Sequence, residues 1–381
     1  MTTDTLPALD VAGRIDRLRE RFPDAAGGSG LSPGASAGIE ALFVTRLVNV
    51  RYLTGFTGSA ALLLVGPDEV LFVTDGRYRD QAADQLAEAG VDARIEISGV
   101  EQKRIVHDAA KAAGYARIGL EAHGVTWSQQ RAYAGEWFPG AELVATENVV
   151  EELRRIKDPG EVARIRAACH IADEAFANVR GRLAGRPTEI EFGLDLEFEM
   201  RRLGASAMSF EPIVAAGPNG AKPHARPSDR RIEPGELLVL DFGCMVDGYC
   251  SDMTRTVSVG DPGSEARHMY DVVLESQRAG RDAVRDGVDC AAVDKACRDV
   301  IAEAGWADAF LHGTGHGVGL EIHEDPRVAA TGRGSLASGY VVTVEPGVYL
   351  TGIGGVRIED TVVVTPDGCE ILTGSPKDLV L

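Results

Sequence analysis

The chain has 381 residues, of which 44% are hydrophobic and 25% charged, a balance typical of a globular protein rather than a disordered, fibrous or membrane one. Its 39 Lys and Arg residues against 58 Asp and Glu residues give a formal net charge of −19. That charge would repel a phosphate backbone, so nucleic acid is not an expected partner. The length exceeds what one hydrophobic core usually serves, and two domains are expected.

The cysteines and the N-terminal residues give an expectation for the cellular compartment. Six cysteines are spread along the chain without a CxxC pair or a compact framework, which indicates reduced thiols. The opening residues, MTTDTLPALD, lack the basic and apolar segments of a signal peptide, and no apolar run approaches the roughly 18 residues that a membrane span requires. We therefore expect a cytoplasmic protein without a membrane partner.

Short apolar runs characterise the N-terminal part. Residues 41–45, 60–65 and 69–75 read ALFVT, AALLLV and EVLFVTD. These runs are β-prone, and polar, Ala-rich stretches of helical character alternate with them. This pattern predicts an α/β domain.

The charged stretch at residues 151–165, EELRRIKDPGEVARI, marks the expected domain boundary. Asp158-Pro159-Gly160 interrupts the stretch and precedes a helix start. We predict an α/β domain over residues 1–152 and a second domain over residues 153–381.

Beyond this boundary the sequence predicts a pair of helices. Seven apolar positions at three- and four-residue steps share one helical face: Val162, Ile165, Cys169, Ala172, Phe176, Val179 and Leu183. Gly185 is expected to end this helix. Thr188 and Glu191 have the spacing of a capping box, which predicts a second helix running towards Leu203.

The same order of elements recurs further along the chain. A helix is expected from about Glu265, then a break at Gly287-Val288-Asp289, then a helix towards Ala304. β-rich sequence with two acidic residues follows each helix pair. The second domain is therefore predicted to be an α+β domain of two related halves of about a hundred residues each, with a site between them.

The β-rich sequence of the first half predicts a hairpin with a turn near Val246-Asp247-Gly248. A turn centred between residues 246 and 247 places Asp241 opposite Asp252. Directly opposed side chains have Cβ atoms about 4.5–5.5 Å apart, and like charges there are destabilising. Two facing carboxylates therefore indicate that a positive charge sits between them.

The second half repeats this arrangement. Glu345 and Glu359 are equidistant from Gly352, so a second hairpin places a second acidic pair face to face. Either pair alone could be two exposed acids or a carboxyl dyad that shares a proton. Two such pairs in two related halves favour a cation site.

Between the two hairpins lies LHGTGHGVGLEIHEDP, with three clustered histidines, of which one could add a nitrogen ligand: His312, His316 and His323. Four carboxylates and an imidazole form a hard, oxygen-rich set that favours Mn²⁺, Co²⁺ or Fe²⁺ over a thiolate-rich structural zinc site. Two divalent ions would offset the four negative charges, and a pair about 3.5–4 Å apart suits hydrolysis.

Four ordered motifs, VLDFGCMVDGYCSDMTRT, HGTGHGVGLEIHE, VEPGVYL and GGVRIED, resemble those of the pita-bread metallopeptidases, and within them the aminopeptidase P and prolidase group. NVRYLTGFTGSAALLLV and TDGRYRDQA resemble that group's creatinase-like N-terminal domain, so the resemblance covers nearly the whole chain. The resemblance implies an α/β N-terminal domain followed by a pita-bread catalytic domain.

The resemblance also implies five metal ligands: Asp241, Asp252, His316, Glu345 and Glu359. Asp252 and Glu359 match the bridging carboxylates, and Glu345 also matches the residue that exchanges protons with the bridging water. His224 matches a catalytic histidine that stabilises the tetrahedral intermediate, and His323 matches one near the scissile amide.

Two further residues are expected at the substrate. His312 matches a pocket histidine, with packing beside the ligand loop as the alternative. Arg357 lies two residues before Glu359 on the same strand face, where it could hold a substrate terminus or act as a clamp on the metal carboxylates.

The implied reaction is hydrolysis of the bond between an N-terminal residue and proline by a hydroxide that bridges two divalent ions. The chain is thus predicted to be an Xaa-Pro aminopeptidase, with a dipeptide-specific Xaa-Pro dipeptidase as the alternative. Mn²⁺ is the expected metal, with Co²⁺, Fe²⁺ and Zn²⁺ as alternatives. A proline-containing peptide is the expected substrate, and a homodimer the expected assembly.

Other functions fit the sequence less well. A methionine aminopeptidase would share the fold and ligands, but the long N-terminal domain argues against it. A creatinase-type enzyme does not rely on the metal pair, and a non-catalytic peptide-binding module would have lost the ligands, yet all five ligand types are present. No GxSxG motif surrounds Ser251, which disfavours a serine hydrolase, and HGTGHG is not HExxH, which disfavours a mononuclear zinc protease.

Overall fold

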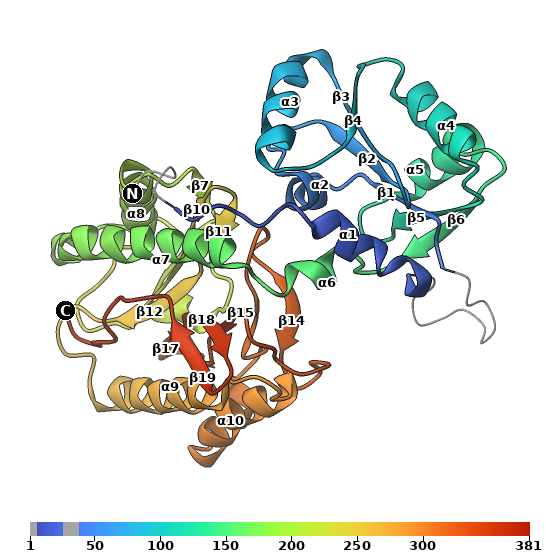
Figure 1. Cartoon of the computed structure of the whole chain (residues 1–381). Coiled ribbons are helices and arrows are strands. Elements are labelled where there is room, and N and C mark those ends of the chain that lie inside the picture. The colour runs from blue at the N-terminus through green and yellow to red at the C-terminus, as the bar shows by residue number, and fades with distance from the viewer. Residues whose placement is uncertain (1–5, 26–37) are drawn as a thin grey trace. The chain divides into compact units, whose positions relative to one another are not determined.

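A computed structural model describes residues 6–25 and 38–381 (Figure 1). The chain forms two compact units that divide after Arg154. One unit contains the described residues from Leu9 to Arg154, and the other contains Arg155–Leu381 together with residues 6–8. This division lies two residues beyond the boundary expected from the sequence, and residues 6–8 join the second unit because the Pro7 carbonyl accepts a hydrogen bond from Arg164 at 2.8 Å.

The unit that ends at Arg154 is built on a six-stranded sheet of order β4-β3-β2-β1-β5-β6. The strands β1–β2 and β2–β3 pair antiparallel, whereas β3–β4, β1–β5 and β5–β6 pair parallel. The strands are β1 (Ala41–Val44), β2 (Ala61–Val65), β3 (Val70–Thr74), β4 (Arg94–Ile97), β5 (Arg117–Glu121) and β6 (Glu142–Thr146). The first three confirm the strands predicted from the apolar runs.

Helices accompany this sheet, so the predicted α/β character is confirmed. The α-helices are α1 (Arg14–Arg19), α2 (Leu47–Thr54), α3 (Arg79–Glu88), α4 (Gln102–Ala113), α5 (Trp127–Ala132) and α6 (Glu151–Arg154). Short turns of other helix types are η2 (Phe22–Asp24), η3 (Gly76–Tyr78) and η4 (Tyr133–Trp137). The apolar side of α4 packs through Val106 and Ala110 into one core with Phe43, Ile118 and Phe138.

The second unit contains the two predicted helix pairs. They are α7 (Pro159–Val179) with α8 (Glu189–Arg202), and α9 (Ser264–Ala283) with α10 (Cys290–Glu303). Asp158 and Thr188 each close a capping box with the glutamate three residues on, which confirms both predicted helix starts. The prediction for the end of α7 was wrong, since the α-helix stops at Val179 and a 3₁₀ segment, η5 (Arg180–Gly185), continues to Gly185.

Each helix pair packs on its own set of strands. With α7 and α8 lie β7 (Ala207–Met208), β8 (Ile213–Ala216), η6 (Gly217–Ala221), β9 (Leu238–Phe242), β10 (Cys244–Val246), β11 (Tyr249–Cys250) and β12 (Met253–Val257). With α9 and α10 lie η7 (Ala307–Ala309), β13 (Gly315–Gly317), β14 (Glu324–Val328), β15 (Val341–Val344), β16 (Gly347–Leu350), β17 (Gly354–Arg357), β18 (Asp360–Thr365) and β19 (Gly368–Ile371).

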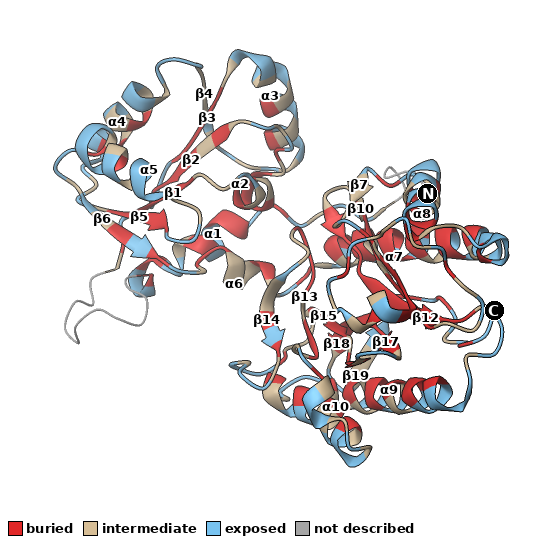
Figure 2. Cartoon of the chain, turned by 180° about the vertical axis from the view of Figure 1, so that it is seen from behind, coloured by how far each residue is buried: buried red, intermediate tan, exposed pale blue. Residues whose placement is uncertain are grey.

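The two halves have separate hydrophobic cores. One core joins Phe176 and Phe192 to Leu240, and the other joins Val273 and Val293 to Val362. Figure 1 shows the strands between α7 on one side and α9 and α10 on the other, and Figure 2 shows buried residues along these strands and along one side of α9. The predicted α+β fold of two related halves is therefore confirmed.

The first acidic hairpin is displaced from its predicted register. Asp241 pairs with Thr254 rather than with Asp252, because the turn is centred between Asp247 and Gly248. Both turn residues have positive φ, 45° and 74°, as a two-residue type I′ hairpin turn requires. The two aspartates are thus diagonal rather than opposed, and they still share a face of the hairpin.

The second acidic hairpin has the predicted register. Val344 pairs with Asp360 and Gly347 pairs with Arg357, so Glu345 and Glu359 occupy opposite positions at the break between these pairings. Gly352 at the tip has φ 91°, which a residue with a side chain rarely adopts.

Candidate metal centre

All five predicted ligands lie in or directly beside strands of the second unit. Asp241 is the penultimate residue of β9, Asp252 immediately precedes β12, and His316 is the middle residue of β13. Glu345 follows β15, and Glu359 lies between β17 and β18. Strand ends fix a side chain more rigidly than loops do, which favours a preorganised site.

Three of these residues form a group that could hold a metal ion. The ligand atoms of Asp252, His316 and Glu359 all lie within 4.8 Å of one another. His316 Nε2 is 3.5 Å from Asp252 Oδ2 and 3.5 Å from Glu345 Oε1, which adds the fourth residue. The two halves therefore contribute carboxylates to one cluster.

The hydrogen bonding of His316 directs a lone pair into this cluster. Its Nδ1 lies 2.9 Å from the Gly317 carbonyl oxygen, which can only accept, so Nδ1 carries the proton and Nε2 is unprotonated. Burial lowers the pKa of His316 to about 4, and the ring is therefore neutral near pH 7. A neutral imidazole oriented through its second nitrogen is the usual state of a metal ligand.

The carboxylates of the cluster repel one another. Burial, together with the charges of Glu359, Asp241 and Glu345, raises the pKa of Asp252 well above its usual value. Burial raises the pKa of Glu345 to about 8, and burial with the charges of Glu345 and Asp241 raises that of Glu359 well above the ordinary range. Without a cation the protein holds protons here at neutral pH.

Two carboxylate oxygens also lack partners. Asp241 Oδ1 and Glu359 Oε1 are buried, and neither has a hydrogen-bond partner among residues 6–25 and 38–381. A buried polar atom without a partner costs free energy, and a bound cation would satisfy both. The donor set and the unpaired oxygens therefore fit divalent metal ions.

Arg357 is committed to the carboxylates. Its Nη2 donates to Asp241 Oδ2 at 2.6 Å, its Nε donates to Thr254 Oγ1 at 3.1 Å, and Thr254 in turn donates to Glu359 Oε2 at 2.7 Å. Burial opposes the charge of Arg357, but Tyr349, Asp241 and Glu345 raise its pKa well above the usual value. With 2% of its surface exposed, Arg357 is buried against Asp241 and Thr254, and both of its predicted roles stay predictions.

His312 is held by hydrogen bonds at both ring nitrogens. Nδ1 lies 2.8 Å from the Gly313 carbonyl oxygen, and Nε2 lies 2.8 Å from Tyr349 Oη. Because Arg357 Nη1 donates to the same hydroxyl at 2.7 Å, the hydroxyl proton points to His312. Burial lowers the pKa of His312 to about 4, so the ring is neutral.

The other two predicted histidines are exposed beside the cluster. The ring centroid of His323 lies 4.4 Å from that of His316, and burial lowers the pKa of His323. His224 follows η6, and its charge contributes to the lowered pKa of both His312 and His323. Both are placed where a substrate could reach them.

Sequence reasoning missed Thr254, Thr343 and Tyr349. Thr343 Oγ1 donates to Glu345 Oε1 at 3.3 Å, and Tyr349 joins His312 to Arg357. Thr254 and Thr343 each lie two residues from a ligand along a strand, so the period of two could have placed them on the ligand's face. Nothing in the sequence pattern singles out Tyr349.

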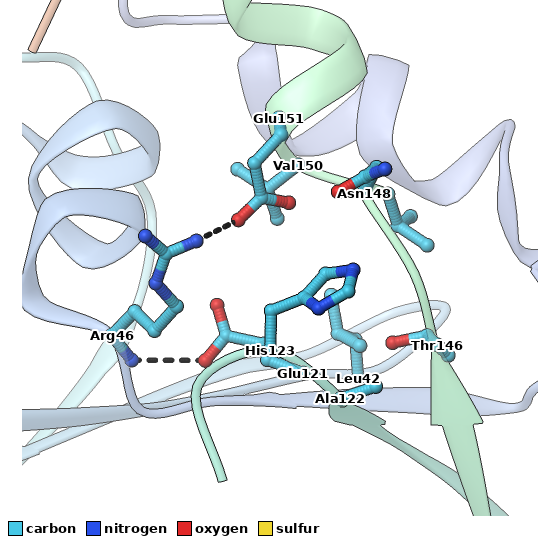
Figure 3. Close-up of a pocket in the computed structure, with 10 residues that line it drawn as sticks. Leu42, Arg46, Glu121, Ala122, His123, Thr146, Asn148, Val150 and Glu151 are labelled. Carbon is cyan, nitrogen blue, oxygen red and sulfur yellow. Dashed lines mark hydrogen bonds and ion pairs between the residues drawn. The ribbon is translucent and has the colours of Figure 1, made fainter. Parts of the chain in front are cut away.

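A separate small pocket lies at the carboxyl ends of β1, β5 and β6 in the first unit (Figure 3). Its charged lining residues already satisfy one another: Glu121 Oε2 accepts from the backbone of Thr45 at 2.7 Å and of Arg46 at 2.9 Å, and Arg46 pairs with Glu151. These contacts tie the end of β5 to the residues that precede α2.

Comparisons with known proteins agree with this geometry. The sequence model of metallopeptidase family M24 matches residues 163–366, and that of the creatinase/prolidase N-terminal domain matches residues 35–156. Over 344 residues the chain is 40% identical to the uncharacterized peptidase YqhT of Bacillus subtilis, covering 90% of this chain and 96% of that one.

Solved structures with the same fold include two peptidases. The Xaa-Pro dipeptidase from Bacillus anthracis has a TM-score of 0.90 and 39% identity, covering 97% of this chain and 99% of its own. The X-Pro aminopeptidase from Thermotoga maritima has a TM-score of 0.84 and 34% identity, covering 90% of this chain and 98% of its own. Among the described residues no helix is long and apolar enough to cross a membrane.

Proposed function

The chain belongs to metallopeptidase family M24, and from this membership we propose that it hydrolyses the bond between an N-terminal residue and a following proline. The observation that carries the proposal is the cluster of Asp252, His316 and Glu359, whose ligand atoms lie within 4.8 Å of one another. Glu345 lies at its edge, 3.5 Å from His316 Nε2. The names of the two structurally similar peptidases support the choice of bond.

We propose five protein ligands for two divalent ions, with Mn²⁺ as the metal: Asp241, Asp252, His316, Glu345 and Glu359. When bound, such ions supply Lewis-acid activation of water and of the substrate carbonyl. Carboxylate oxygens with one imidazole nitrogen suit Mn²⁺, Co²⁺ or Fe²⁺, and Zn²⁺ is also compatible. Among the described residues, the group that could hold a metal ion contains no cysteine.

The chain's own groups then move protons and fix the substrate. Glu345 is proposed to take a proton from the attacking water and pass it to the leaving nitrogen, a role that needs a carboxylate within hydrogen-bond reach of the nucleophile. His224 would donate to the oxygen that becomes negatively charged, and His323 would contact the scissile amide. His312 and Arg357 remain candidates for substrate contact through the Tyr349 hydroxyl that joins them.

Substrate length separates two versions of this proposal. The sequence favoured a general Xaa-Pro aminopeptidase, whereas the more similar of the two solved structures is named a dipeptidase. Both cut the same bond, so the shared chemistry is the proposal and the dipeptide is its first test substrate.

Assembly, compartment and domain roles belong to the same proposal. We propose a cytoplasmic homodimer whose partner is a proline-containing peptide and not nucleic acid or a membrane. The net charge of −19 supports the exclusion of nucleic acid. The creatinase-like domain is proposed to end, and the catalytic domain to begin, at the 152/153 boundary read from the sequence.

The test is hydrolysis of Ala-Pro and Ala-Pro-Ala by metal-stripped protein reloaded with Mn²⁺, with Asp252→Ala as control. Cleavage of the dipeptide alone supports a dipeptidase, and cleavage of the tripeptide supports an aminopeptidase. Cleavage of neither by folded, metal-loaded protein would overturn the proposal. Fast release of methionine from Met-Ala-Ser would replace it with a methionine aminopeptidase.

A further inference from the structure

Helix α10 carries two ion pairs of the same spacing that face different surroundings. Arg298 Nε lies 2.7 Å from Asp294 Oδ2, and Lys295 Nζ lies 2.6 Å from Asp299 Oδ2. The Asp294 side chain is 1% exposed, whereas Lys295 and Asp299 are 71% and 57% exposed. Of these two pairs, only Asp294–Arg298 includes a buried side chain.

Arg298 holds the loop that precedes the ligand histidine. Its Nη1 donates to the Phe310 carbonyl oxygen at 3.2 Å, and its Nη2 donates to the His312 carbonyl oxygen. The guanidinium carbon lies 4.2 Å from the centroid of the Phe310 ring. The centroids of the Phe310 and His312 rings are 5.2 Å apart, and the two rings are nearly perpendicular. The two terminal nitrogens of Arg298 thus hold two alternate residues, Phe310 and His312. Both belong to residues 310–314, a segment outside any helix or strand.

Asp294 holds the next alternate residue of the same loop. Its Oδ1 accepts hydrogen bonds from Thr314 N at 3.1 Å and from Thr314 Oγ1 at 2.9 Å. The Thr314 carbonyl oxygen in turn accepts from Glu345 N at 2.7 Å. A single backbone hydrogen bond therefore connects the clamped loop to a candidate metal ligand in another strand segment.

We propose that Asp294 and Arg298 are positioning residues for the metal centre, acting through the backbone of residues 310–314 on Glu345 and on His316 two residues beyond. Neither touches a metal ligand's side chain. The inference rests on the proposed function, since it assigns Glu345 and His316 to the metals. α10 is a rigid support for the clamp, because Val293, Cys297 and Ile301 anchor it in the core.

The test compares Arg298→Ala and Arg298→Lys with Lys295→Ala, the equivalent truncation at the exposed pair. Mn²⁺ affinity is measured by calorimetry on metal-stripped protein, and kcat and KM are measured separately on Ala-Pro. Partners beyond the ligands typically change metal affinity or activity by about 10- to 100-fold. We expect both Arg298 variants to weaken Mn²⁺ binding about tenfold and to lower kcat more than they change KM, and Lys295→Ala to stay within about twofold.

Arg298→Lys is the deciding variant if Arg298→Ala does not fold, because lysine keeps the charge beside Asp294 but lacks the planar guanidinium whose two nitrogens reach the Phe310 and His312 carbonyl oxygens separately. Wild-type Mn²⁺ affinity and kcat in folded Arg298→Lys would overturn the inference. So would an equal loss in Lys295→Ala. A wild-type protein that binds Mn²⁺ and cleaves neither peptide would defeat the proposed function alone, since the affinity comparison still tests the clamp.

Discussion

Glu359 and Asp360 are consecutive and almost fully buried, at 1% and 0% exposure, yet their charges are treated in opposite ways. Arg255 Nη2 lies 3.1 Å from Asp360 Oδ1 and Lys377 Nζ lies 2.7 Å from Oδ2. Burial opposes ionisation of Asp360, but these two cations lower its pKa. Burial and neighbouring carboxylates instead raise the pKa of Glu359 well above its usual value.

The two carboxylates differ in how far the chain itself compensates their burial. Asp360 also accepts from Gln277 Nε2 at 2.8 Å and Thr373 Oγ1 at 2.9 Å, so the chain satisfies it without help. Among the described residues, the Glu359 carboxylate receives one hydrogen bond, from Thr254, and its Oε1 has no partner. Burial of a carboxylate without sufficient compensation is costly, and it indicates a cation supplied from outside the chain.

The largest expected effect is on activity at Glu359. Glu359→Gln keeps the shape and the hydrogen bond from Thr254 but removes a metal-binding charge, so kcat/KM on Ala-Pro with saturating Mn²⁺ is expected to fall about 10³-fold or more. The same variant should not destabilise the metal-free protein, because the amide is uncharged, like the protonated carboxyl that the raised pKa of Glu359 favours there. Activity within tenfold of wild type would remove Glu359 from the metal site.

Asp360→Asn is expected to lower the stability of the protein instead. It leaves the buried guanidinium of Arg255 with less negative charge beside it, and breaking a buried pair typically costs about 3–5 kcal/mol. Urea denaturation should show a loss of about 3 kcal/mol, with Glu359→Gln as the adjacent control. A loss under about 0.5 kcal/mol would show that Asp360 is not neutralised as the contacts indicate.

A third comparison is of metal-free and metal-loaded protein across neutral pH. The folded pKa of Glu345, about 8, lies above the unfolded value of 4.5, so the folded state binds the extra proton and stability is lost as pH rises through about 8. His312 and His316 affect stability only at lower pH, since their folded pKa values of about 4 lie below the ordinary histidine pKa of 6.5. Between about pH 7 and pH 9 we expect metal-free protein to lose about 1.4 kcal/mol of stability through Glu345.

Manganese should cancel this loss. An ion that binds only folded protein stabilises it by about 2.7 kcal/mol at a hundred times its Kd, and it replaces the protons that the carboxylates hold. Equilibrium denaturation at both pH values, with and without Mn²⁺, measures the effect. A stability of metal-free protein that rises over this pH range would contradict the assigned repulsion.

The hairpins show how far the sequence could be followed. The alternation of β-prone runs and the turn glycines placed Glu345 opposite Glu359 correctly. The other register was two residues off because the turn centre was placed before Asp247, although an Asp-Gly pair is the stronger signal for a two-residue turn. Centring the turn on Asp247-Gly248 would have paired Asp241 with Thr254, as found.

Contacts between remote segments lay beyond sequence reasoning. Arg255 donates to the Ser375 carbonyl oxygen at 3.0 Å, and Arg298 reaches the His312 carbonyl oxygen, yet neither partner is marked by periodicity or by a motif. A local pattern fixes which face a side chain occupies, but not which distant backbone atom meets it. The identity of the five candidate ligands was therefore accessible from the sequence, whereas the residues that orient them were not.

The smallest expected effect concerns how much each of the two cations, Arg255 and Lys377, contributes to neutralising Asp360. Lys377 is 23% exposed and Arg255 only 1%, so water already screens the lysine. Lys377→Met leaves Asp360 its contacts with Arg255, Gln277 and Thr373, and should cost only about 1 kcal/mol in urea denaturation. Lys295→Met, at an exposed pair, is the control and should stay within about 0.5 kcal/mol. A cost for Lys377→Met equal to that of Asp360→Asn would instead make the lysine the principal counter-charge, and the contrast with Glu359 would then depend on one surface residue.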